Sequence, residues 1–236
     1  MTATRDRPFW AVLVLCLAVA AGCRGNATPE ETSKQPQPQP ATGPTAGEDS
    51  RPKIVALGDS LTAGLGLMEA QAYPALLQTR IDVEGYAFEV VNAGVSGDTT
   101  AGGLRRLDWA LDGDVRILIL ALGANDGLRG LSVAEMKNNL SRIIERAKEE
   151  EIVVILAGME APPNYGADYT ASFRRVYPDL AREHGVRLLP FLLANVAGDT
   201  TLNQSDGIHP NARGAQIIAE GLWIVLQPIL DDLTTS

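Results

Sequence analysis

The stretch KIVALGDSLTAGLGL, residues 53–67, joins an apolar segment typical of a β-strand to a glycine-rich loop. Residues 54–57 are all apolar, as in a strand that is buried on both faces of a sheet. A glycine-rich turn after such a strand presents either backbone N–H groups that bind a phosphate or one exposed side chain, which here is Ser60. The rest of the sequence decides between these two uses.

Five short apolar runs of this kind alternate with helical patterns. The other four cover residues 88–91, 115–122, 152–156 and 186–189, and all are rich in Val, Ile and Leu. Alternating strands and helices give a parallel sheet with helices on both faces. The predicted fold class is therefore α/β, a three-layer α/β/α sandwich around a central parallel sheet of about five strands.

Three helices are predicted from their ends and apolar faces. One begins with the capping box of Ser132 and Glu135 and buries Leu140, Ile143, Ile144 and Ala147. A second ends at Gly185, and we expect Pro178 inside it to kink or divide the helix. The last begins at about Ala212 and turns an apolar face inward, formed by Ile217, Ile218, Leu222 and Val225.

Length and charge narrow the class of protein. A chain of 236 residues is enough for one domain of ordinary size. The formal net charge of −9 excludes nucleic acid as an expected partner, because phosphate binding needs a basic surface.

The N-terminus has the pattern of an export signal. Arg5 and Arg7 precede an apolar run over residues 9–21, which is shorter than the roughly 20 residues that span a bilayer. The ending VAAGC, residues 19–23, resembles the lipobox of bacterial lipoproteins, so residues 1–22 are predicted to be a signal peptide and Cys23 to be lipidated. The alternative is ordinary signal cleavage, which would leave Cys23 a free thiol.

Residues 23–52 are predicted to be a disordered linker, because they are rich in Pro, Gln and Thr and poor in apolar residues. The folded domain then covers residues 53–236. We expect an exported monomer on the periplasmic or cell-surface side, held to the membrane only through a lipid on Cys23. Cys16 leaves with the signal, so the mature chain has no second cysteine for a disulfide.

The phosphate-binding interpretation of the glycine-rich loop fails on residue types. A P-loop ends in Gly-Lys-Ser/Thr, but the nearest lysine, Lys53, precedes the strand. The spacing of a dinucleotide fingerprint is broken at Glu69, and Asp59 would place a carboxylate beside the anion. An exposed Ser60 side chain fits better, provided that a base and an oxyanion hole exist.

The candidate base is His209, one of only two histidines in the chain. The other, His184, falls in the last turn of a predicted helix, where a cation complements the helix dipole. His209 follows Asp206 by three residues, so the carboxylate can reach the ring Nδ1–H and turn Nε2 toward a serine. Taken alone, the same spacing also suits a turn aspartate beside a surface histidine.

Three groups could form the oxyanion hole, each in a loop that follows a predicted strand. They are the backbone N–H of Ser60, the backbone N–H of Gly94, and the side-chain amide of Asn125. A glycine suits this role at position 94, because a Cβ there would obstruct the substrate oxygen. Each residue alone could equally be an ordinary turn or cap residue.

Four blocks of this sequence together resemble the SGNH (GDSL) hydrolase family. They are GDSLTAG at residues 58–64, NAGVSGDTT at 92–100, GANDGLRG at 123–130 and DGIHPN at 206–211, and NYG, YPDLA and LLPF resemble its thioesterase I/lysophospholipase/arylesterase branch. The resemblance implies a flavodoxin-like fold with Ser60 as nucleophile. It also implies a triad completed by Asp206 and His209, an oxyanion hole completed by Gly94 and Asn125, and no metal or other cofactor.

The resemblance also implies a substrate class, namely esters or thioesters of medium- to long-chain acyl groups. Leu128, Leu131 and Tyr165 are expected to line the acyl groove. Two alternatives remain open at this point. One is a carbohydrate O-acetyl esterase, and the other is a non-catalytic lipoprotein that binds lipid or glycan.

Overall fold

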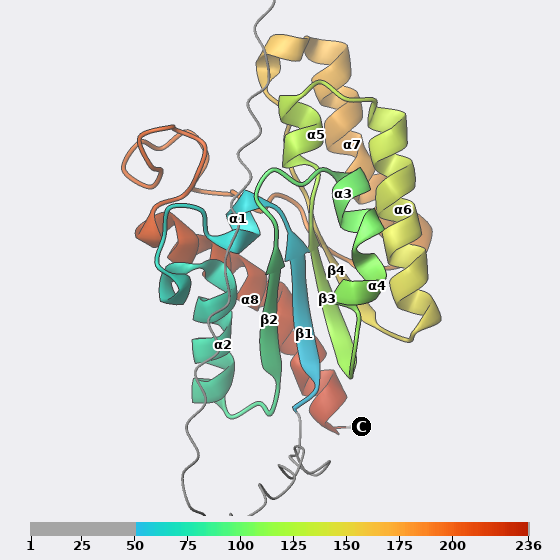
Figure 1. Cartoon of the computed structure of the whole chain (residues 1–236), viewed down its shortest axis with the longest axis vertical. Coiled ribbons are helices and arrows are strands. Elements are labelled where there is room, and N and C mark those ends of the chain that lie inside the picture. The colour runs from blue at the N-terminus through green and yellow to red at the C-terminus, as the bar shows by residue number, and fades with distance from the viewer. Residues whose placement is uncertain (1–50, 236) are drawn as a thin grey trace, which may run out of the picture. The chain divides into compact units, whose positions relative to one another are not determined.

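Five parallel strands form one sheet in the computed structural model, which describes residues 51–235 (Figure 1). The strands are β1 (Lys53–Gly58), β2 (Glu89–Gly94), β3 (Val115–Ala121), β4 (Val153–Ala157) and β5 (Arg187–Leu189). Their order is β2-β1-β3-β4-β5, and β1 pairs in parallel with both β2 and β3. The predicted fold class and parallel sheet are confirmed.

Helices cover both faces of this sheet. They are α1 (Ser60–Ala63), α2 (Tyr73–Glu84), α3 (Thr100–Arg105), α4 (Leu107–Ala110), α5 (Ala124–Leu128), α6 (Val133–Glu149), α7 (Ala167–His184) and α8 (Ala212–Thr235). Two short 3₁₀ turns, η1 (Glu69–Gln71) and η2 (Pro163–Tyr165), complete the elements. Helices α2 and α8 pack against each other in one layer, and α3, α6 and α7 pack together in the other (Figure 1).

The core lies where the two helical layers meet the central strands. Strands β1 and β3 are buried on both faces over most of their length, where their apolar side chains meet a helix or another strand. The exception in β3 is Arg116, which is exposed near the start of the strand. The predicted face of α6 is also fully buried, at Leu140, Ile143, Ile144 and Ala147. On α8, Ile218 and Leu222 are buried, whereas Ile217 and Val225 are only partly covered.

The predicted helix ends are found, and of the two effects expected of Pro178, a kink or a division of the helix, the division does not occur. The Ser132 side chain accepts the N–H of Glu135 at 3.3 Å, and Gly185 ends α7 in the left-handed region at φ 68°. Helix α7 nevertheless runs through Pro178 as a single element. The proline removes one backbone donor. Buried side chains on both sides of it, including Phe173 and Leu180, hold the two halves on the sheet.

The predictions for the N-terminus fall outside the described residues. They comprise the signal peptide at residues 1–22, lipidation of Cys23 and all but the last two residues of the linker predicted at 23–52. Those two residues contact the domain, because Arg51 pairs with Asp82 at 2.9 Å and the Pro52 carbonyl accepts the N–H of Glu89 at 3.0 Å. Among residues 51–235, none of the helices is both long and apolar enough to cross a membrane.

Candidate active site

Ser60 lies at the sharp turn between the central strand β1 and the short helix α1. The strand ends at Gly58, and the Asp59 side chain caps the helix by accepting the N–H of Leu61 at 3.0 Å. Helix α1 then ends at Gly64, which adopts the left-handed region at φ 73°. This short, capped helix carries Ser60 in its first turn, at the carboxyl edge of the sheet.

A chain of hydrogen bonds joins Ser60 to the two residues predicted to accompany it. The Oγ of Ser60 is 2.9 Å from Nε2 of His209, and Nδ1 of His209 is 2.7 Å from Oδ2 of Asp206. A carboxylate can only accept here, so Nδ1 carries the ring proton and Nε2 faces the serine hydroxyl. The arrangement can take a proton from Ser60 and stabilise the imidazolium that results.

The Asp206 carboxylate is held in its charged form by the loop around it. Its Oδ1 accepts the backbone N–H groups of Ile208 and His209, each at 3.0 Å. These bonds, that of His209 first, and the bond from the His209 ring lower the pKa of Asp206 to about 2. The carboxylate therefore stays ionised over the whole range in which His209 can act.

His209 is carried by a small hairpin that the sequence analysis did not predict. Asn203 pairs with Pro210 in an antiparallel bridge, and the N–H of Gln204 donates to the carbonyl of His209 at 2.7 Å. The Gln204 amide also donates to the carbonyl of Leu65 at 2.7 Å and to that of Pro210 at 2.9 Å. These bonds tie the hairpin to the loop that follows α1. The polar run NQSD at residues 203–206 was the available signal.

Asn125 lies across from Ser60 and is oriented by Asp59. Its Nδ2 donates to Oδ2 of Asp59 at 3.2 Å. The Asp59 side chain is fully buried, and this burial raises its pKa to about 6, against the bonds from Leu61 and Asn125, which lower it. From the sequence, Asp59 was only a carboxylate that would repel a bound phosphate. The structure shows it bound to a predicted oxyanion donor.

Gly94 is found at the expected edge, but for a different reason than predicted. A Cβ at this position would lie 2.2 Å from the backbone nitrogen of Ala63 and 2.7 Å from the Ala63 Cα. The glycine therefore makes room for α1, whereas the expectation from the sequence was that it makes room for a substrate oxygen. The Gly94 N–H donates to Oδ1 of Asn92 at 3.0 Å, a bond that an oxyanion would have to replace.

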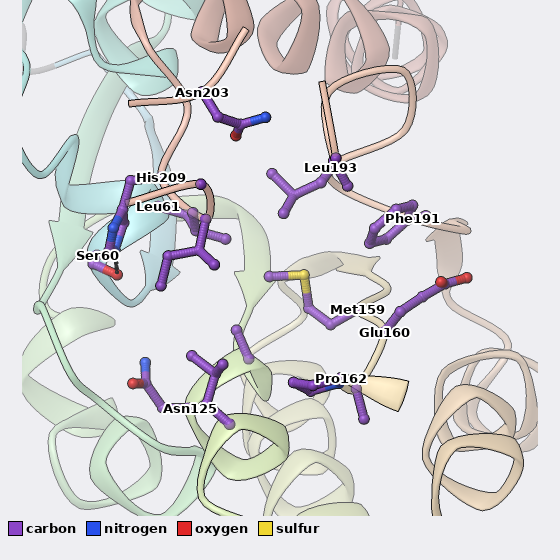
Figure 2. Close-up of a pocket in the computed structure, with 17 residues that line it drawn as sticks. Ser60, Leu61, Asn125, Met159, Glu160, Pro162, Phe191, Leu193, Asn203 and His209 are labelled. Carbon is purple, nitrogen blue, oxygen red and sulfur yellow. Dashed lines mark hydrogen bonds between the residues drawn. The ribbon is translucent and has the colours of Figure 1, made fainter. Parts of the chain in front are cut away.

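A pocket of about 490 Å³ opens beside Ser60 (Figure 2). Ser60, Asn125 and His209 line it together with Leu128, one of the three residues expected in the acyl groove. The further lining residues include Leu61 of α1, Met159 after β4, Phe191 and Leu193 after β5, and Asn203 and Ile208 of the hairpin. The walls are largely apolar, and Glu160, which pairs with Arg174 at 3.1 Å, lies across the pocket from Ser60 (Figure 2).

Leu131 and Tyr165 lie outside the pocket lining, contrary to the prediction. The Tyr165 hydroxyl donates to the carbonyl of Leu128 at 2.7 Å, and the Tyr169 hydroxyl donates to that of Leu131 at 2.9 Å. The two tyrosine rings pack with their centroids 5.3 Å apart. Tyr165 thus fixes the backbone that carries Leu128.

The other histidine, His184, makes a contact between two helices. Nε2 of His184 is 2.8 Å from the Ser141 hydroxyl, which ties the end of α7 to α6. Among residues 51–235, no group of three or more His, Cys, Asp or Glu side chains is arranged to hold a metal ion.

Known proteins share the sequence of this domain. Residues 56–217 match the GDSL-like Lipase/Acylhydrolase family. Esterase TesA of Pseudomonas aeruginosa is 42% identical over 178 residues, which is 75% of this chain and 89% of that protein. The thioesterase 1/protease 1/lysophospholipase L1 of Escherichia coli strain K12 is 37% identical over 179 residues, or 75% of this chain and 85% of its own length.

A solved structure extends the comparison to three dimensions. The crystal structure of TesA matches with a TM-score of 0.72 and 42% identity, and it covers 75% of this chain and 98% of its own.

Proposed function

The chain belongs to the GDSL-like lipase/acylhydrolase family and hydrolyses ester bonds, and on that premise we propose that it cleaves medium- to long-chain acyl esters or thioesters through an acyl-enzyme on Ser60. One observation carries the proposal. The hydrogen-bonded chain from Ser60 through His209 to Asp206 opens directly onto an apolar pocket of about 490 Å³.

The proposed mechanism uses each group in the position described. His209 takes the Ser60 proton as Oγ attacks the carbonyl carbon, and Asp206 stabilises the imidazolium. The carbonyl oxygen becomes an oxyanion, which the Ser60 and Gly94 N–H groups and the Asn125 amide stabilise. The imidazolium then protonates the leaving alcohol or thiol. Water, activated by His209, releases the acid and restores Ser60.

One of the three oxyanion donors needs a change of partner in this mechanism. The Gly94 N–H must leave the Asn92 side chain, whereas Asn125 can keep one N–H on Asp59 and offer the second N–H of its amide to the oxyanion. Such bonds are often poorly aligned before substrate is bound. An Asn125→Ala variant should lower kcat by about 10²–10³-fold, and near-normal turnover would remove Asn125 from the mechanism.

The size of the pocket favours a substrate with an acyl chain of several carbons rather than an acetyl group. Its volume falls within the range of sites that enclose drug-sized ligands, and its walls are mostly apolar. A carbohydrate O-acetyl esterase would need a much smaller acyl site and polar groups for the sugar. A protein that only binds lipid or glycan would have no use for a serine, a histidine and an aspartate joined by hydrogen bonds, as Ser60, His209 and Asp206 are.

The N-terminal sequence supports a proposal about location. Residues 1–22 act as a lipoprotein signal peptide, Cys23 carries the lipid, and residues 23–52 link it to a hydrolase domain that covers residues 53–236. The mature enzyme is then an exported monomer held at the periplasmic or cell-surface side. Mass spectrometry of the mature N-terminus tests this, because an unmodified Cys23 would contradict the lipid anchor.

The first test of the function is labelling with a fluorophosphonate probe, together with turnover of p-nitrophenyl esters from C2 to C16. A single adduct on Ser60 and fastest turnover at medium or long chains are expected. An adduct with activity only at C2 would favour the acetyl esterase. A folded protein without adduct or turnover would contradict the proposed mechanism.

A further inference from the structure

Asn203 is a buried polar residue in the pocket wall that the mechanism does not use. Its exposed fraction is 6%, and it lines the same pocket as Ser60 and His209. It lies in the hairpin that carries His209, directly opposite Pro210. The hydrogen bond from Gln204 to the His209 carbonyl closes the hairpin one residue further on. Asn203 therefore belongs to the same hairpin as His209 and to the wall of the same pocket.

The orientation of the Asn203 amide is fixed by its partners. Its Nδ2 donates to the carbonyl of Val196 at 2.7 Å and to that of Asp199 at 2.8 Å. Carbonyl oxygens can only accept, so the nitrogen must face them and both of its protons are used. The Oδ1 oxygen is thereby left on the opposite side of the amide.

No donor within residues 51–235 bonds to this oxygen. It is also not fully enclosed, because the fully buried unpaired side-chain atoms of the described residues are Nη1 of Arg106 and Nε1 of Trp223. Figure 2 shows the Asn203 side chain over the pocket, with its oxygen on the pocket side. The pocket therefore contains a fixed, unsatisfied acceptor.

This acceptor has an energetic consequence for an acyl chain that fills the pocket. An all-methylene chain displaces water from Oδ1 and offers nothing in return, so the acceptor is left without a partner, which is unfavourable for a buried polar group. A chain that carries a hydroxyl at the right carbon restores the bond. The neighbouring Leu193 and Met159 side chains offer no strong acceptor that would compete for that hydroxyl, and the Glu160 carboxylate in the same lining is paired with Arg174.

We propose that Asn203 is a specificity-determining residue whose Oδ1 accepts a hydroxyl of the substrate, so that the preferred acyl groups are hydroxylated near the carbonyl end. The inference rests on the proposed function, in which the acyl chain occupies this pocket. The hydroxyl belongs near the carbonyl because Asn203 shares its hairpin with His209. A 3-hydroxyacyl chain places a donor a few bonds from the carbon that Ser60 attacks.

The test compares matched thioesters with the full chain. Decanoyl, 2-hydroxydecanoyl and both enantiomers of 3-hydroxydecanoyl N-acetylcysteamine thioesters are assayed by thiol release. One hydroxylated substrate should exceed decanoyl in kcat/KM by about fivefold, since one neutral hydrogen bond contributes roughly 1 kcal/mol and 1.4 kcal/mol is tenfold. A single preferred position and enantiomer is expected, because the acceptor is fixed.

Two variants separate recognition from structural damage. Asn203→Leu removes the acceptor and should bring the ratio of hydroxylated to plain substrate to about one, even if loss of the two carbonyl bonds lowers its Tm. Leu193→Ala changes the same wall without touching the acceptor, and should lower both rates while the ratio persists.

The outcomes distinguish a failure of the role proposed for Asn203 from a failure of the proposed function. Turnover of decanoyl thioester with no hydroxylated substrate preferred overturns the role of Asn203 alone. A preference that survives in Asn203→Leu does the same, because the acceptor must then lie elsewhere. No turnover of any thioester or ester overturns the proposed function, and the inference with it.

Discussion

The two halves of the active site are held in place by different means. The turn that carries Ser60 is buried, and backbone packs directly on backbone where Gly94 meets Ala63. The hairpin that carries His209 is largely exposed, and side-chain hydrogen bonds from Asn203, Gln204 and Asp206 give it its shape.

This difference predicts two kinds of sensitivity. A site held by close packing tolerates no added atom, since interiors are packed as densely as crystals and backbone cannot move aside cheaply. A site held by hydrogen bonds tolerates a change of size but not the loss of a charge or donor. Four substitutions, taken in order of expected effect, test whether the two halves follow these rules.

The largest effect is expected in the hairpin, at Asp206. Asp206→Asn keeps the size of the side chain but removes the charge that orients the His209 ring, so kcat should fall by about 10³–10⁴-fold. Initial rates on a p-nitrophenyl ester measure this. Asp199→Asn is the matched control, because Asp199 bonds Thr201 in the same segment, and it should change kcat little. Equal losses in both variants would mean that Asp206 acts only by shaping the loop.

The next effect is expected on the packed side, at Gly94. Gly94→Ala places a Cβ 2.2 Å from the Ala63 nitrogen, so α1 must shift and carry Ser60 with it. A displacement of about 1 Å at reacting atoms can cost 10²-fold in rate. Both kcat and Tm should therefore fall. Gly221→Ala adds the same methyl group to α8 in open space and should leave both unchanged or slightly raise Tm. A fully active Gly94→Ala enzyme would contradict the close-packed description.

A third prediction uses pH to probe Asp59, the buried group of the packed half. Its pKa is raised from 3.8 to about 6, so the folded protein binds this proton more tightly than the unfolded chain does. Its contribution to stability is therefore complete below pH 4 and is lost as pH rises through about 6, a change of roughly 3 kcal/mol. Asp59→Asn should lack this fall.

Denaturant unfolding at pH 4, 5, 6 and 7 makes the comparison. The difference in the free energy of unfolding between the wild type and Asp59→Asn should change with pH in the stated direction. A difference that stays constant across this range would show that Asp59 remains ionised in the folded protein.

The smallest effect is expected at Gln204, which links the two halves. Gln204→Ala removes the bonds to Leu65 and Pro210, and should lower the free energy of unfolding by about 1–2 kcal/mol and kcat by several-fold. Gln216→Ala on the exposed side of α8 is the control and should be neutral. A larger loss of kcat than in Gly94→Ala would place the weak point of the site at this link.

The sequence predicted the sheet because its strands are short, mostly apolar runs between helical patterns. The bounds of β1 and β3 differ from the predicted runs by only one residue at an end. Ser60, Asp206 and His209 were also predictable, because loops that follow parallel strands meet at one edge and the chain offers only two histidines. The hydrogen bonds among them could then be anticipated from residue types.

Contacts between distant segments were not predictable in the same way. Tyr165 was expected in the pocket, but the sequence cannot tell which face of a loop its ring takes. Asn203 and Gln204 read as ordinary loop residues, since their roles depend on carbonyl groups that only the folded hairpin presents. Pro178 was misread because propensity was weighed without the buried side chains that hold α7 on the sheet.

The parallel sheet also fixes where the enzyme can be attached to something else. Strand β1 begins at Lys53 and ends beside Ser60, so its six residues, at about 3.3 Å each, put roughly 20 Å between the point of entry and the pocket. Helix α8 returns from the His209 hairpin, and the C-terminal end lies near the start of β1 (Figure 1). A support or fusion partner joined directly ahead of β1 or directly after α8 therefore meets the edge opposite the pocket and leaves the mouth open to substrate.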